Sequence, residues 1–462
     1  MLAAGVEGDA KPFDRLALEV FRYQYAHNEP YRVFCEAKRS SPDVVESWRE
    51  IPAFPTEAFK AGIVTSFPLE EAVMANVTSG TTSPNRRGMI FRDELGRRLA
   101  LTANRVMTGA YLFPDFQEGE RCRILILAPS LKLAPGMGMA IGMEETRKHF
   151  GTPDSTFLLG RTGIEAGKLV DALRRSESDG VAVALVGSTS AFVYFLRACA
   201  KKGMRFALPA GSRIADGGGY RGRFGELTRD DYYELVGEVL GIEDHHCVNT
   251  LGMAECGTNY FDNSLRGFTK GGGCVARHKS PPPWTRVIAA SVEDLSPLPP
   301  GEVGLLRHYD LINLPTVLAV QTDNLGFTDD RGGFEIVGRA RIVDGKVSAT
   351  PDLGPVGPMG SRRGLRLLEK YVNFSIDLKM SLMRQRRVQA PEPEPAIPDA
   401  TLPSCPGVVD DMVAAAEDPT SAERAEAALR VFERAYSDAD KVIRDGGGQE
   451  AFAQTGDGQD GA

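Results

Sequence analysis

The sequence contains few cysteines and tryptophans, and it has no long apolar run. Seven cysteines and two tryptophans occur among 462 residues. Cysteines this sparse form no regularly spaced framework, which excludes a small disulfide-stapled scaffold and favours a reducing compartment. No apolar run approaches the roughly 18 residues of a membrane-spanning helix, and the first residues lack the basic and apolar regions of a signal peptide. We therefore expect a cytoplasmic protein with no membrane insertion.

Several catalytic signatures are also missing. The chain has neither the GxxxxGK[ST] pattern of a P-loop nor the GxSxG pattern of a serine hydrolase nucleophile elbow. The glycines at residues 135–142 follow an apolar run at too great a distance for a dinucleotide fingerprint, and the methionines between them indicate packing or an apolar pocket. A zinc cluster is not expected, because only Cys274 and His278 have metal-like spacing among the residues considered for one, which are His245, His246, Cys247, Cys256, Cys274 and His278.

Charge is distributed unevenly. The chain has 62 acidic and 54 basic residues, a net charge of −8. Of these, 16 acidic and 5 basic residues follow residue 390, so the acidity belongs to the tail and the preceding body carries about +3. This balance argues against general nucleic-acid binding. A nearly neutral body leaves room for a local site that binds an anionic substrate.

The order of apolar segments predicts an α/β fold. Helical spacing marks parts of the first sixty residues, and from residue 123 strand-like runs (123–129, 156–160, 181–187 and 204–208) alternate with amphipathic helical ones (139–150, 164–175 and 189–201). Apolar strands alternating with helices indicate a mostly parallel sheet. The sequence of residues 284–344 predicts a region rich in β-strands.

Composition also suggests how the chain divides. A length of 462 residues predicts two or three domains. We expect one large domain over residues 1–340 and a small or shortened C-terminal domain over residues 341–388. A proline-rich linker follows over residues 389–408, and residues 409–462 form an acidic tail, helical or disordered.

Residues 77–87, VTSGTTSPNRR, hold the densest group of hydroxyl side chains. Hydroxyls and exposed amides around a glycine are the donors that phosphate oxygens need, and the arginines that follow add positive charge. The residues alone leave two interpretations open, a phosphate-binding loop and a Ser/Thr-rich surface turn.

The segment SGTTSPNR resembles the SGTTGxPK phosphate loop of the adenylate-forming superfamily. Further segments resemble that superfamily in the same order: DGGGYRGR (216–223), LGMAECG (251–257), GEVGLL (301–306), VQTDNLG (320–326) and VGRAR (337–341). Across residues 15–345, the segments IPAFPTEAFK (51–60), GGGYRGR, LGMAECG, PPPWTRV (281–287) and GEVGLL are similar more narrowly to the acyl-protein synthetases of bacterial bioluminescence.

The resemblance implies an ATP-dependent enzyme that uses Mg²⁺ and converts a fatty or related carboxylic acid to an acyl-adenylate. The acyl group then passes to a protein cysteine as a thioester, for an acyl reductase partner. It implies catalytic roles for Glu255, which also binds Mg²⁺, and for Arg86. The synthetases that the chain resembles use a cysteine near their C-terminus, and Cys405, the only cysteine after Cys274, is the candidate for this catalytic thiol, with an incidental thiol in the tail as the alternative. The ATP contacts that it implies are Thr78, Ser79, Gly80, Thr81, Thr82, Gly217, Gly218, Gly219, Tyr220, Asp323 and Arg339.

The resemblance leaves three questions open. The C-terminal lysine of the superfamily matches no motif, with Lys346, Lys370 and Lys379 as candidates. A CoA ligase of the phenylacetate type is the first alternative, since it shares the adenylation step and needs no role for Cys405. A degenerate adenylate-binding scaffold is the second, because Ser83, Leu251 and Thr322 depart from the superfamily pattern.

Overall fold

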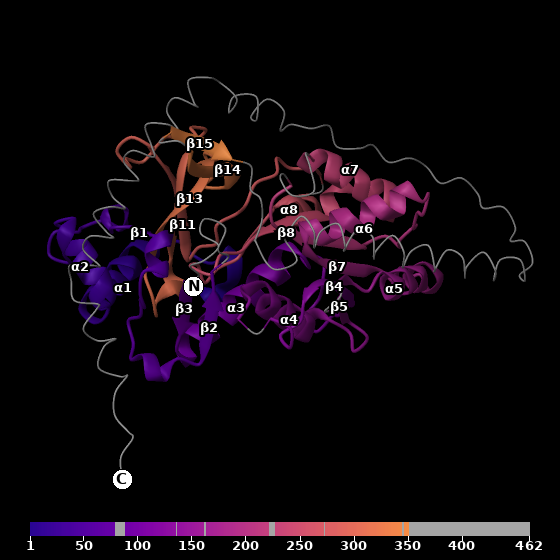
Figure 1. Ribbon diagram of the computed structural model, residues 1–462, viewed down its shortest axis with the longest axis horizontal. Coiled ribbons are helices and arrows are strands. Elements are labelled where there is room, and N and C mark those ends of the chain that lie inside the picture. The colour runs from indigo at the N-terminus through magenta and orange to yellow at the C-terminus, as the bar shows by residue number, and fades with distance from the viewer. Residues whose placement is uncertain are drawn as a thin grey trace, which may run out of the picture.

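The computed structural model describes residues 1–78, 88–134, 136–160, 163–220, 227–271, 273–343 and 346–350, with side chains up to residue 340. Two β-sheets lie side by side, the second of them next to the N-terminal helices (Figure 1). The predicted linker, the acidic tail and most of the predicted C-terminal domain lie outside the described residues, so these boundaries remain predictions.

The first sheet confirms the expected parallel α/β arrangement. Its strand order is β10-β9-β8-β7-β4-β5-β6, with parallel pairing from β9 through β5 and antiparallel pairing at both edges. The strands are β4 (Arg123–Pro129), β5 (Thr156–Gly160), β6 (Gly163–Ile164), β7 (Val183–Ser188), β8 (Arg213–Gly217), β9 (Cys247–Leu251) and β10 (Tyr260–Phe261).

Helices cover both faces of this sheet, which explains why its strands are apolar at consecutive positions. Along β4, Leu125 and Leu127 pack in one core with α5, α6 and α7, whereas Ile124 and Ile126 pack in another with α3, α4 and α8. The helices are α3 (Glu94–Tyr111), α4 (Gly138–Phe150), α5 (Ala166–Asp179), α6 (Thr189–Lys201), α7 (Arg229–Leu240) and α8 (Ser264–Gly271).

The order of the strands indicates which edge of this sheet binds a ligand. Strands β5 and β7 lie on opposite sides of β4, so the winding direction reverses there. Parallel α/β sheets bind ligands outside the carboxyl ends of their strands at such a reversal. The glycine turn after β8 and the loop after β9 both leave from this edge.

One predicted strand was wrong. Residues 204–208 form no strand; β8 begins at Arg213 instead. The amides of Phe206 and Leu208 donate to the carbonyls of Val239 and Leu240 at the end of α7. The alternating apolar residues of this segment therefore cover a helix end, which period-2 spacing alone does not distinguish from a strand.

The second sheet confirms the β-rich part. It runs β11-β12-β13-β14-β15 in antiparallel order, and β1 pairs in parallel with β13. Its strands are β1 (Phe54–Pro55), β11 (Thr285–Ala290), β12 (Gly304–Asp310), β13 (Ala319–Thr328), β14 (Phe334–Val343) and β15 (Lys346–Thr350). The predicted domain boundary at residue 340 falls inside β14, since β14 and β15 pair as one hairpin.

The N-terminal helices pack against this sheet. In their common core, Phe13 contacts Trp48 edge-on, and Trp48 contacts Tyr309 of β12. The helices are α1 (Phe13–His27) and α2 (Glu29–Ala37); the short helices are η1 (Leu2–Glu7), η2 (Trp48–Glu50), η3 (Thr56–Lys60), η4 (Leu69–Glu71), η5 (Asp244–His246) and η6 (Leu311–Asn313).

Lys279 joins the two sheets through its backbone and its side chain. Its amide and carbonyl exchange hydrogen bonds with Phe334 of β14. Its ammonium donates to the buried Asp262 at 3.1 Å, and Arg277 donates to the other oxygen of Asp262 at 3.2 Å. Burial alone would raise the pKa of Asp262, but Lys279 and Arg277 hold it below its ordinary value. This buried ion network fixes one sheet against the other.

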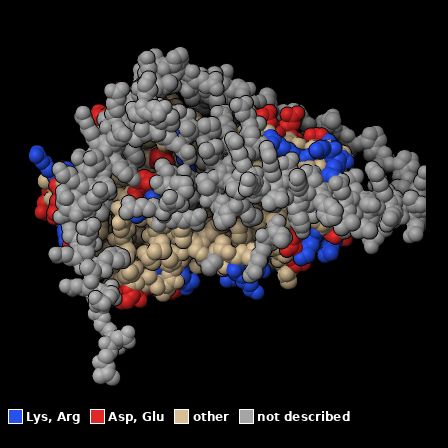
Figure 2. Space-filling model, in the orientation of Figure 1, with Lys and Arg blue, Asp and Glu red and all other residues tan. Residues whose placement is uncertain are grey.

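None of the helices in the described part of the chain is long and apolar enough to cross a membrane. On the face of the molecule in Figure 2, acidic and basic side chains of the described residues lie near one another. Mixed charge of this kind is consistent with a body that is nearly neutral.

Candidate functional site

A hairpin formed by β2 (Met74–Val77) and β3 (Met89–Arg92) holds the two ends of the predicted phosphate loop together. The amide of Thr78 donates to the carbonyl of Gly88 at 2.9 Å, and the amide of Gly88 donates to Thr78 Oγ1 at 2.9 Å. The hydroxyl of Thr78 thus closes the base of the loop. The other predicted residues of this loop, Ser79, Gly80, Thr81, Thr82 and Arg86, lie outside the described part of the chain.

The predicted adenine-side glycine turn follows β8. Gly217 pairs with Thr250 of β9, and a Cβ on Gly217 would lie 3.1 Å from Thr250 Oγ1. Gly218 has a φ of 119°, which side chains rarely allow. Gly219 and Tyr220 come next, with the ring of Tyr220 tilted against Tyr232.

The motif DGGGY begins with Asp216, a buried residue whose structural role was not predicted from the sequence. Asp216 accepts hydrogen bonds from Thr189 Oγ1 at 2.6 Å, Asn249 Nδ2 at 3.0 Å and the hydroxyl of Tyr220 at 3.4 Å. Burial raises its pKa to about 6, although these donors act in the opposite direction. Asp216 therefore connects β8, β9 and α6 beneath the glycine turn.

The loop after β9 carries Glu255, and two buried side chains hold its backbone. Asn313 Nδ2 donates to the carbonyl of Glu255 at 2.9 Å, and Arg92 Nη2 donates to the carbonyl of Ala254 at 3.4 Å. Gly257 packs so closely against Ile312 that a Cβ there would lie 2.3 Å from Ile312 Cγ2. The course of this loop is therefore set by packing from η6.

Three charged side chains act electrostatically on Glu255. Burial raises the pKa of Glu255 to about 7; the charge of Asp323 acts in the same direction, and the charges of Arg339 and Lys60 oppose it. The predicted residues Asp323 and Arg339 thus both lie within electrostatic reach of Glu255. Sequence reasoning missed Lys60, although it ends the segment IPAFPTEAFK that was noted for its resemblance.

The second sheet positions two of these residues. Asp323 lies on β13 and Arg339 on β14, where Arg339 is the register partner of Asn324. Asn324 in turn donates from Nδ2 to Sδ of Met253 at 3.5 Å, in the loop that carries Glu255. The site is therefore assembled from the carboxyl edge of the first sheet and the middle of the second.

The donor set fits a magnesium ion. Mg²⁺ is usually held by one or two carboxylates together with phosphate oxygens and water, and Glu255 and Asp323 supply carboxylates that repel one another. Burial disfavours the charged form of Glu255, and a bound cation would offset that cost.

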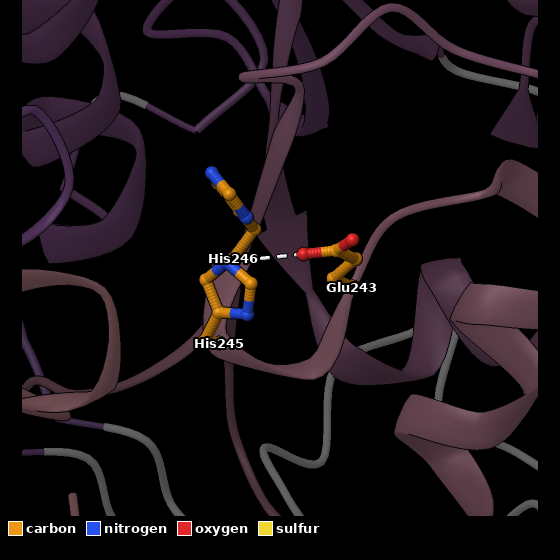
Figure 3. A group of neighbouring side chains, drawn as sticks. All are labelled: Glu243, His245 and His246. Atoms are coloured by element: carbon orange, nitrogen blue, oxygen red, sulfur yellow. Dashed lines mark ion pairs between the residues drawn. The ribbon is translucent and has the colours of Figure 1, made fainter. Parts of the chain in front are cut away.

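The histidines considered for a zinc cluster lie elsewhere. His245 and His246 lie next to Glu243, with ligand atoms within 4.8 Å of one another, and His245 Nε2 is 3.2 Å from Glu243 Oε2 (Figure 3). Burial lowers the pKa of both histidines, to about 4 for His246. This group precedes β9, at the opposite end of that strand from the loop of Glu255. His278 instead pairs with Asp329.

Cys405 and the candidate lysines Lys370 and Lys379 lie outside the described residues, while the backbone of Lys346 begins β15. Burial raises the pKa of three other thiols to about 12, those of Cys35, Cys122 and Cys199. Burial also raises the pKa of Cys247 and Cys256 well above the ordinary value of a thiol. These five thiols are poor nucleophiles at neutral pH.

Comparison with known proteins identifies the family. Residues 2–349 match the family model described as acyl-protein synthetase, LuxE. Long-chain-fatty-acid–luciferin-component ligases from Vibrio harveyi and Aliivibrio fischeri are each 25% identical to the chain, over 324 and 321 residues. The alignments cover 69% of this chain and 80% and 79% of those relatives.

Solved structures show the same fold. The structure of 2-hydroxyisobutyryl-CoA ligase in the postadenylation state, with 2-HIB-AMP, superposes with a TM-score of 0.52 at 14% identity, covering 72% of this chain and 69% of that one. This likeness confirms the adenylate-forming fold. Because the family match extends over well more than half of the sequence, the chain belongs to the acyl-protein synthetase, LuxE, family of ligases.

Proposed function

We propose that the protein activates a fatty or related carboxylic acid with ATP and then transfers the acyl group to a protein thiol. The observation that carries this proposal is the convergence of Glu255, Asp323 and Arg339 from two sheets on one charged site. Membership of the acyl-protein synthetase family supports the same reaction.

In the first step a carboxylate oxygen of the acid attacks the α-phosphorus of ATP. An acyl–O–P bond forms, and the bond between the α-phosphorus and the departing pyrophosphate oxygen breaks. The nucleophile is already ionised, so no general base is needed. The chief obstacle is repulsion between two anions, and positive charge in the site lowers it.

Each residue of the site has its own role in adenylate formation. Asp323 orients the nucleotide by accepting hydrogen bonds from the ribose hydroxyls, and Arg339 and Arg86 supply positive charge. Thr78 to Thr82 hold the phosphates, and Gly217, Gly218, Gly219 and Tyr220 lie against the adenine. Glu255 holds Mg²⁺, which supplies charge neutralisation at the phosphates when it is bound.

In the second step a thiolate sulfur attacks the acyl carbonyl and AMP leaves, which forms a thioester. Cys405 is our candidate for this nucleophile. An ordinary free thiol has a pKa of about 8.5 and is a few per cent thiolate at neutral pH. The five free thiols of the described residues have raised pKa values, which favours a cysteine outside them. An acyl reductase is the partner that would then take the acyl group.

The test is the intact mass of the protein after incubation with Mg²⁺, ATP and a panel of saturated fatty acids without CoA. We expect an acyl-sized mass gain in the wild type that is absent from Cys405→Ser. Cys122→Ser is the matched control, since Cys122 is a free cysteine that is only partly buried. A gain that persists in Cys405→Ser would assign the thiol to another cysteine. AMP release only after CoA is added would favour the CoA ligase.

A further inference from the structure

The short helix η3 runs beside the strand that carries Asp323. Strand β1 pairs in parallel with β13, with Phe54 opposite Val320 and Pro55 opposite Gln321. The chain continues directly into η3 (Thr56–Lys60), which packs against β13. The N-terminal segment therefore reaches the site from the edge of the second sheet, independently of the C-terminal part of the chain.

The backbone at the end of η3 also packs against the residue that leaves the phosphate loop. A Cβ on Gly88 would lie 2.6 Å from the carbonyl oxygen of Phe59 and 3.2 Å from the amide nitrogen of Lys60. No side chain fits at Gly88, and this close contact places Lys60 next to the base of the loop.

The side chain of Lys60 is held in place. It is only 9% exposed and forms an ion pair with Glu57, which is 18% exposed. An ammonium has three N–H donors, and the pair with Glu57 engages one of them. Ala58 and Phe59 belong to the core against which Ala254 packs, directly before Glu255. Lys60 thus ends a helix that packs against β13 and the base of the phosphate loop, within electrostatic reach of Glu255.

We propose that the ε-ammonium of Lys60 binds the anions that meet during adenylation, the carboxylate of the acid and the α-phosphate of ATP. This inference rests on the proposed function. The step forms the acyl–O–P bond, releases pyrophosphate and transfers no proton, so the part of Lys60 is to bind the anions. A fixed cation in a site with little water stabilises the charge that builds up on the transferred phosphoryl group more strongly than water would.

The principal test compares Lys60→Met with the wild type in exchange of labelled pyrophosphate into ATP that depends on a saturated fatty acid. Loss of one donor that stabilises a transition state lowers kcat by about 100-fold or more. We expect a loss of that size in Lys60→Met, with partial recovery in Lys60→Arg and no loss in Lys38→Met, which removes an exposed lysine from the end of α2. A Lys60→Met variant that keeps most of the wild-type kcat would overturn the inference.

A second measurement uses the wild-type protein and therefore does not depend on how the variants fold. Lysines are acetylated with an N-hydroxysuccinimide ester, with and without a non-hydrolysable acyl-adenylate analogue, and mapped by mass spectrometry. We expect the analogue to protect Lys60 and leave Lys38 unprotected. Unchanged acetylation of Lys60 beside an active wild type rejects the inference alone. Absence of exchange in the wild type with every acid rejects the proposed function itself.

Discussion

Asn324 of β13 donates a hydrogen bond from Nδ2 to Sδ of Met253 at 3.5 Å. Asn324 lies in the second sheet and Met253 in the loop after β9 of the first sheet. Asn324 directly follows the predicted site residue Asp323, and Met253 lies two residues before the predicted site residue Glu255. This contact therefore couples the position of Asp323, the proposed ribose-binding carboxylate, to that of Glu255, the proposed magnesium ligand.

Asn324→Ala removes this contact, and we expect the rate of adenylate formation to fall about 3- to 10-fold, in line with a hydrogen bond of about 1 kcal/mol. Met253→Leu keeps the volume and removes the acceptor. Pyrophosphate exchange in the two single variants and the double variant forms a double-mutant cycle. Losses that simply add in the double variant would contradict a direct coupling.

The hydroxyl of Thr78 is expected to stabilise the base of the phosphate loop. Thr78→Val leaves the amide of Gly88 without its acceptor, which costs about 1–3 kcal/mol for a buried donor. We expect weaker ATP binding and a lower free energy of unfolding in Thr78→Val, and near wild-type values in Thr78→Ser. Calorimetric titration with ATP and urea unfolding would check both. Equal losses in the serine and valine variants would mean that the hydroxyl is not what matters.

Gly257→Ala tests how tightly packing sets the loop of Glu255. The new Cβ would lie 2.3 Å from Ile312 Cγ2, so Ile312 or the loop must move. Overpacking of this kind costs about 1–3 kcal/mol, and we expect lower stability together with slower pyrophosphate exchange. Gly62→Ala is the matched control, because a Cβ at Gly62 meets no atom within 4 Å. Similar behaviour of the two variants would show that the loop tolerates the shift.

Asp216 is expected to make stability depend on pH. Its folded-state pKa of about 6 lies above its ordinary value of 3.8, so the folded state holds the proton more tightly. The stability that this group contributes is fully present below about pH 4 and is lost as the pH rises through 6, a change of about 3 kcal/mol.

Asp216→Asn removes this titration and keeps an acceptor for Thr189 and Asn249. Urea unfolding at pH 4.5 and 7.5 should therefore show the asparagine variant gaining stability relative to the wild type at the higher pH. A difference between the two proteins that is the same at both pH values would refute the raised pKa.

Local features of the sequence determined much of this protein. Consecutive apolar residues in RILILAP predicted β4, because a strand covered by helices on both faces needs apolar side chains at every position. Gly218, in a turn that needs a positive φ, and the motifs around Glu255, Asp323 and Arg339 could be identified from short segments, since each depends on near neighbours in the chain.

Only the tertiary structure decided which charges meet. Lys60 lies far along the chain from Glu255, and it reaches the site because β1 pairs with β13. Asp216 acquired its raised pKa from burial beneath α6 and β9, and residues 204–208 capped a helix end instead of forming a strand. These properties depend on long-range packing, and no local residue pattern encodes the distance between segments that are brought together only when the sheets assemble.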